Sequence, residues 1–68
     1  MNAAQLIPAM LQQFQNEIKP LKGAADTPEN RAAAAQIIAH HAARLQLADL
    51  EMSNDQARAT LANAYRQL

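Results

Sequence analysis

Large apolar residues recur at intervals of three and four along the first third of the chain, and mainly glutamine, asparagine and lysine lie between them. This spacing places the apolar side chains on one stripe of a helix and the polar side chains on the opposite face. The pattern predicts a helix over about residues 3–22. Its stripe consists of Ile7, Met10, Leu11, Phe14, Ile18 and Leu21.

Because of two prolines, the sequence alone does not fix where this helix begins and ends. Pro8 suits the first turn of a helix, where its missing N–H costs nothing. Alternatively, Asn2 caps an earlier start and Pro8 bends the helix. Pro20 predicts a kink or a loose last turn before Gly23, the only glycine. Gly23 suits the left-handed residue that follows a helix.

A second helix is predicted over about residues 28–50. Thr27 serves as its N-cap, Pro28 as its first residue, and Glu29 faces the positive end of the helix. Leu47 and Leu50 point away from the main apolar stripe, and a helix with large apolar groups on two faces usually contacts more than one neighbour. The main stripe consists of Ala34, Ile38, Ala42, Leu45 and Ala48, flanked by Ile37 and His41.

A third helix is predicted over about residues 54–67. Ser53 and Gln56 have the spacing of a capping box, in which each side chain bonds the backbone N–H of the other residue. Asp55 at the start and Arg66 near the end both complement the helix dipole. The apolar face consists of Ala57, Leu61, Ala64 and Leu68, with Tyr65 at its edge.

The composition favours helix throughout. Half of the 68 residues are apolar, 17 of them are alanine, and valine and tryptophan are absent. A strand needs the β-branched and aromatic residues that this chain largely lacks, and its length is enough for one domain. We therefore expect an all-α fold in which a helical hairpin is followed by a short third helix, within a single domain over 1–68.

The large apolar residues exceed what one copy of the chain is expected to cover. A chain of this length buries only about 60% of its unfolded surface. It has no cysteine for a disulfide or a thiolate metal site, and the second helix faces the first mostly with alanine. We therefore expect a homodimeric helical bundle. Its core and dimer contacts are predicted to include Ile7, Met10, Leu11, Phe14, Ile18, Leu21, Ile38, Leu45 and Leu61.

The charge pattern argues against two classes of partner. Six basic and six acidic residues give a net charge of zero, without the basic stripe that neutralises phosphates in a nucleic-acid binder. No apolar run approaches the roughly 18 residues that a membrane span needs. The first residues also lack the basic start of a signal peptide. We expect a cytoplasmic protein that binds neither nucleic acid nor membrane.

Candidate chemistry is sparse. Neighbouring residues diverge by about 100° around a helix, so His40 and His41 cannot chelate one ion from a single chain. We expect His41 half-buried at the edge of the apolar stripe and His40 in solvent. Ser53, the sole serine, is already the predicted cap, and three short helices are expected to enclose too little volume for a cleft of roughly a few hundred Å³. The prediction is that the chain has no catalytic residue, no cofactor and no metal.

These observations favour a non-catalytic protein–protein interaction module, a small regulator or inhibitor of a larger protein, of the kind that phages and other mobile elements encode. One alternative is a structural subunit or secretion-type co-chaperone that is stable only in a hetero-complex. A DNA-associated regulator is the third. Arg44 and Tyr65 are candidate partner contacts because both residue types are enriched at binding hot spots. Leu47 and Leu50 join them because they point away from the core stripe.

Overall fold

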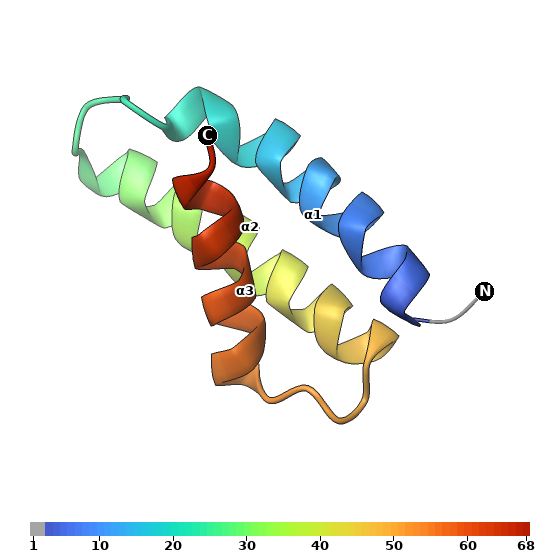
Figure 1. Cartoon of the computed structure of the whole chain (residues 1–68). Helices are drawn as coiled ribbons and strands as arrows, with labels where there is room; N and C mark the ends of the chain where they lie inside the picture. The colour runs from blue at the N-terminus through green and yellow to red at the C-terminus, as the bar shows by residue number, and fades with distance from the viewer. Residues whose placement is uncertain (1–2) are drawn as a thin grey trace.

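The computed structural model describes residues 3–68, and all its regular elements are helical. Helices α1 (Ala3–Ile18) and α2 (Pro28–Ala48) form an antiparallel hairpin, and α3 (Asn54–Arg66) crosses both of them (Figure 1). A short 3₁₀ helix, η1 (Lys19–Leu21), extends α1. The predicted all-α class and the arrangement of a hairpin with a shorter third helix are confirmed.

Helix α1 begins early enough to place Pro8 in its interior. This position leaves one backbone carbonyl of the preceding turn without its helical donor, and it excludes the alternative in which Pro8 lies in the first turn. The proposed cap Asn2 lies outside the described residues. Pro20 lies in the 3₁₀ turn of η1, which confirms the predicted loose last turn. Gly23 follows with a φ of 84°, the left-handed conformation expected of it.

Helix α2 begins as predicted and ends earlier than predicted. The Thr27 hydroxyl accepts a hydrogen bond from the backbone N–H of Asn30 at 3.1 Å, and Pro28 is the first helical residue. The helix ends at Ala48 rather than near residue 50. Asp49 adopts extended backbone angles, and its carboxylate accepts the backbone N–H of Glu51 at 3.1 Å. Aspartate competes with the helix in this way because its short side chain offers nearby N–H groups an alternative acceptor.

Both halves of the predicted capping box are present at the start of α3. The Ser53 hydroxyl accepts the Gln56 N–H at 3.1 Å, and the Gln56 side chain accepts the Ser53 N–H at 2.9 Å. The helix ends at Arg66, one residue before the predicted end.

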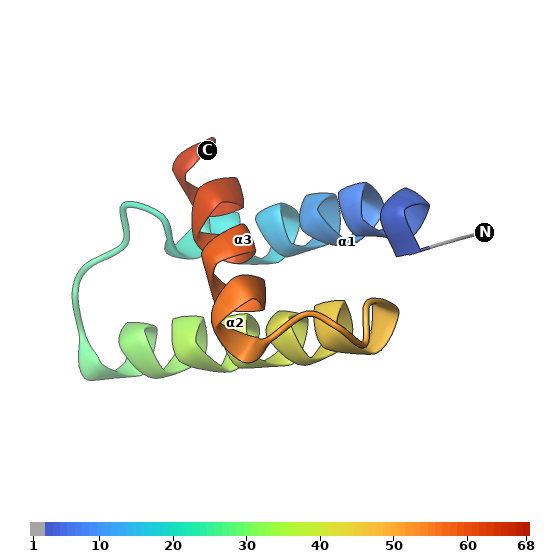
Figure 2. The ribbon, with the colours of Figure 1, turned by 60° about the horizontal axis from the view of Figure 1, so that its bottom comes forward.

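The core lies where the three helices meet. Helix α3 packs against both helices of the hairpin, and Figure 2 shows it standing across the gap between them. The stripe residues of α1 and η1 that are not fully buried all pack against the edge of this core, as do Ile37 and Met52. The buried hydrophobic residues are Phe14, Ile18, Ala42, Leu45, Ala57, Leu61 and Ala64.

Within residues 3–68, none of the helices combines the length and the apolar character that crossing a membrane requires.

Candidate interaction groove

A groove of about 340 Å³ opens beside the core, at the end of the hairpin that carries the loop between η1 and α2. The last turns of α1, the first half of α2 and one face of α3 form its walls, and apolar atoms make up most of the lining. Figure 2 shows the two hairpin helices joined at this end by the long loop, with α3 crossing nearby. The lining includes Phe14, Ile18, Leu21, Ala34, Ile38, Leu61, Ala62 and Tyr65.

The size of this groove contradicts one expectation from the sequence. Three short helices were expected to enclose too little volume for a cleft of this size. The reason for the difference is the loop that joins the hairpin helices: it spans 22–27, so the two helices need not close tightly at that end. Alanine at positions 34 and 62 leaves the space between them unfilled.

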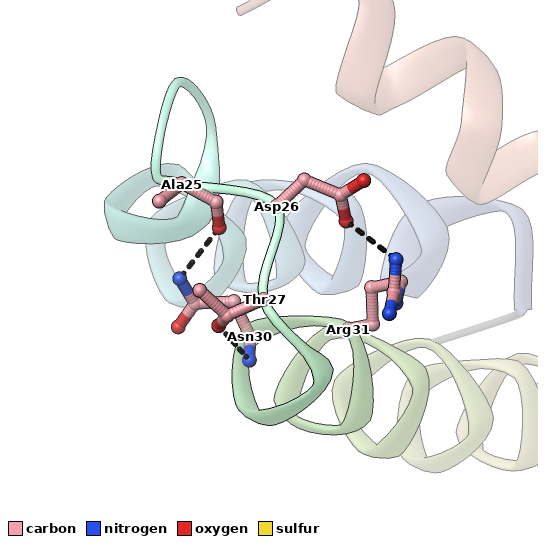
Figure 3. Close-up of polar contacts among 5 residues, drawn as sticks. All are labelled: Ala25, Asp26, Thr27, Asn30 and Arg31. Atoms are coloured by element: carbon pink, nitrogen blue, oxygen red, sulfur yellow. Dashed lines mark hydrogen bonds and ion pairs between the residues drawn. The ribbon is translucent and has the colours of Figure 1, made fainter.

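Charged side chains line the rim of the apolar groove. Arg31 donates to the Asp26 carboxylate at 3.1 Å (Figure 3). Asn30 donates from its side chain to the Ala25 carbonyl at 2.8 Å, which ties the same loop to the start of α2. On the opposite wall, Nε of Arg58 donates to the Asn54 side chain at 2.8 Å. The rim therefore presents two guanidinium groups and one carboxylate, and that carboxylate is already paired.

Tyr65 closes the groove near the C-terminal end of α3 and is 37% exposed. The Lys22 ammonium lies 5.1 Å from the centre of its ring, a cation–π distance. Lys22 also donates to the backbone carbonyls of Tyr65 and Leu68. These contacts hold the end of α3 against the loop that follows η1, so Tyr65 has a fixed position on the groove wall.

A polar pair bridges α1 and α2 beside the core. His41 is 2% exposed, so it is fully buried rather than half-buried at the edge of the stripe. Its Nε2 lies 2.5 Å from Oε2 of Glu17, and because a carboxylate only accepts, Nε2 donates. The His41 ring meets the Phe14 ring edge-on at 5.5 Å. Its Nδ1 is buried without a hydrogen-bond partner in the described part of the chain.

The His41–Glu17 pair explains why the prediction of a half-buried His41 was wrong. The sequence places His41 beside the stripe, where a histidine alone would retain some contact with water. Glu17 lies one turn after Phe14 on the facing helix and supplies the acceptor that makes full burial tolerable. His40 is exposed, as expected. Among residues 3–68, no three histidine or acidic side chains come together in a way that would hold a metal ion.

The predicted core and dimer residues divide into two groups. Phe14, Ile18, Leu45 and Leu61 are buried within one copy of the chain. The others pack against the edge of this core and keep part of their surface in solvent: Ile7, Met10, Leu11, Leu21 and Ile38.

The four predicted partner contacts do not form one surface. Tyr65 lines the groove. Arg44 donates to the Gln13 side chain at 2.8 Å and bridges α1 to α2. Leu47 and Leu50 lie at the far end of α2 and are 77% and 85% exposed, the two most exposed of the large hydrophobic residues. The structure therefore separates a groove that contains Tyr65 from a protruding pair of leucines.

Sequence reasoning missed most of the groove wall that α3 supplies. Residues 58, 61, 62 and 65 share one face of the helix, but the predicted apolar face of 57, 61, 64 and 68, with Tyr65 at its edge, left out Arg58 and Ala62. The signal in the sequence was Arg58, which lies one turn before Leu61 and Ala62 and could have indicated a charged rim beside apolar residues. Ala62 carried no signal, because a small residue marks a cavity only when its neighbours are known.

Comparison with protein families, with curated proteins and with solved structures finds no match to this chain. The groove, the charges at its rim and the exposed leucines are the features of the chain that bear on its function.

Proposed function

We propose that this chain is a non-catalytic protein–protein interaction module, a small regulator or inhibitor that binds a larger protein and also associates with itself. The observation that carries the proposal is the apolar groove between the hairpin and α3, with its arginines at the rim. A concave, mostly apolar surface with a few polar groups is the usual form of a binding site.

The residues of the groove also have the composition of a binding hot spot. Tyrosine and arginine are enriched among the residues that dominate binding energy, and both types line this groove. The Asp26–Arg31 ion pair and the Lys22 contacts of Tyr65 restrain side chains at its rim. Binding to walls that are already ordered loses little conformational entropy.

The lining defines the chemistry of the partner segment. The apolar floor accommodates an aliphatic or aromatic anchor, and the guanidinium groups of Arg31 and Arg58 favour a carboxylate next to that anchor. A segment with lysine or arginine at that position would meet like charge at the rim. The proposed partner therefore presents an apolar side chain flanked by aspartate or glutamate.

Photo-cross-linking in the native cell tests this proposal. A photoreactive phenylalanine analogue replaces Ala25, which is exposed on the loop at the rim of the groove, or Gln36, which is exposed and lies outside the groove. We expect a discrete cross-linked product from position 25 and none from position 36. An additional Arg58→Glu substitution should weaken the product at position 25. Equal labelling from both positions, or no product from position 25, would contradict the proposal.

A further inference from the structure

The turn between α2 and α3 combines the two most exposed leucines with a cluster of negative charge. Leu47 and Leu50 protrude into solvent at 77% and 85% exposure. Asp49, Glu51 and Asp55 lie beside them, with no basic residue between Arg44 and Arg58. Residues 47–55 form this segment, the acidic leucine turn. Exposed leucines are common on protein surfaces, but this pair lies on a turn whose shape is fixed.

Several hydrogen bonds hold the acidic leucine turn in place. Gln46 donates to the Met52 carbonyl at 3.4 Å and accepts from the Asn54 side chain at 3.3 Å. Met52 packs against the core. The Asp49 carboxylate accepts the Glu51 N–H at 3.1 Å. Because the inner side of the turn is anchored, Leu50 projects from a rigid base, and its burial by another molecule would order little additional backbone.

The groove offers the opposite properties. Its floor is apolar, and its rim carries Arg31 and Arg58. Arg31 lies at the start of α2, at the other end of the hairpin, whereas Arg58 lies on α3, one turn after Asn54. Arg31 already pairs with Asp26, whereas Arg58 donates only from Nε, so the two terminal nitrogens of its guanidinium have no hydrogen-bond partner within residues 3–68. The Glu51 side chain makes no hydrogen bond or ion pair within residues 3–68. Leu50 therefore forms an apolar knob flanked by carboxylates, and it is complementary in polarity and in charge to an apolar groove with the unpaired guanidinium nitrogens of Arg58 at its rim.

We infer that the acidic leucine turn of one copy binds in the groove of a second copy. Leu50 fills the groove against Phe14 and Tyr65, and the Glu51 carboxylate pairs with Arg58. This inference rests on the proposed function, because it assigns an occupant to the same groove. It names a second copy of the chain because this chain itself presents the chemistry that the groove selects.

The contact joins two different surfaces, so it is heterologous. The knob and the groove lie at different ends of α2. Two copies either exchange knobs reciprocally and close as a dimer, or each copy binds the next and the assembly grows. In both cases, a chain in which Leu50 is replaced can still accept Leu50 of another copy in its own groove. A chain whose groove is filled can still place its Leu50 in the groove of another copy.

Sedimentation of three proteins tests the contact. Leu50→Asp places a charge on the knob. Ala62→Trp fills the groove from within its own chain. We expect the wild type to sediment above the monomer mass and each single variant to sediment mainly as a monomer, with dissociation constants raised about ten- to a hundredfold by the loss of one buried leucine. An equimolar mixture of the two variants should regain association, because it pairs an intact knob with an intact groove.

Matched variants guard against loss of folding. Gln36→Asp introduces the same charge as Leu50→Asp on an exposed α2 position outside the groove, and it should leave the mass of the assembly unchanged. If Ala62→Trp reduces the helical signal in circular dichroism, the charge-exchange pair replaces it. Arg58→Glu and Glu51→Arg should each weaken association several-fold, and the chain that carries both should recover it.

Two results would overturn the inference. One is a wild-type protein that remains monomeric at millimolar concentration. The other is an assembly whose dissociation constant does not change in Leu50→Asp. A monomeric wild type would also remove self-association from the proposed function. Neither result removes the groove as the binding surface for a larger protein: a cross-linked product between position 25 and a different protein would keep the groove as a binding surface while excluding the second copy as its occupant.

Discussion

Replacing Phe14 by alanine tests where the core lies. Phe14 is 1% exposed and is the largest of the fully buried side chains. Its ring packs edge-on against His41 and also forms part of the groove floor. The substitution removes the aromatic ring from the point where all three helices meet, and the alanines and leucines around it are too short to refill the space.

The expected loss is a large share of the total stability. Truncation of a buried phenylalanine to alanine costs about 3–5 kcal/mol. The groove beside Phe14 already opens to solvent, so water can enter the new space, and we expect the lower half of that range. A domain of this length has roughly 3–10 kcal/mol of stability in total, at about 0.05–0.15 kcal/mol per residue. Phe14→Ala should therefore be mostly unfolded at room temperature or melt far below the wild type.

Urea denaturation followed by circular dichroism measures this loss. All variants are compared at one chain concentration, because self-association makes apparent stability depend on concentration. Leu6→Ala is the control on the same helix: Leu6 is 40% exposed, and its truncation should cost about 1 kcal/mol. If Phe14→Ala unfolds at the same urea concentration as the wild type, or as Leu6→Ala, the core has been placed wrongly.

Substitutions at three further positions test local features by the same assay. Gly23→Ala should lower the free energy of unfolding by about 1–2 kcal/mol, because φ is 84° and an L side chain strains the backbone there. Steric clash adds nothing, since an added Cβ meets no atom within 4 Å. Unchanged stability would mean that this residue is not left-handed in solution. Ser53→Ala should lose about 1 kcal/mol with the cap of α3, and an unchanged melt would show that the cap contributes nothing. Glu17→Ala should lose about 1–2 kcal/mol because His41 stays buried without its acceptor, whereas Glu17→Gln keeps an acceptor and should lose less; equal losses would exclude the hydrogen bond as the cause.

The helices and their ends were largely predictable, because local chemistry determines them. The spacing of the apolar residues in α1 identifies its buried side, and Thr27, Ser53 and Gly23 occupy the capping positions that the sequence indicated. The early end of α2 was missed because the prediction followed Leu47 and Leu50 as helical residues and did not weigh the ability of Asp49 to bond the backbone of its own turn.

The groove could not be predicted, because it depends on how far apart the helices lie. No residue pattern states that α3 crosses the hairpin and leaves open the end with the long loop. The burial of His41 likewise depends on Glu17 from the facing helix, a pairing that appears only when the register of the hairpin is known. The sequence correctly indicated Leu47 and Leu50 as residues that point away from the core, and the structure places them far from the groove that contains Tyr65.

The central claim is that Leu50 of a second copy of the chain fills the groove beside α3. Isotope-filtered nuclear magnetic resonance on a mixture of labelled and unlabelled copies measures this directly, because it records only contacts between molecules. We predict contacts from the methyl groups of Leu50 in one copy to the aromatic rings of Phe14 and Tyr65 in the other. An associated sample whose intermolecular contacts all lie elsewhere, with none to either ring, would contradict the claim.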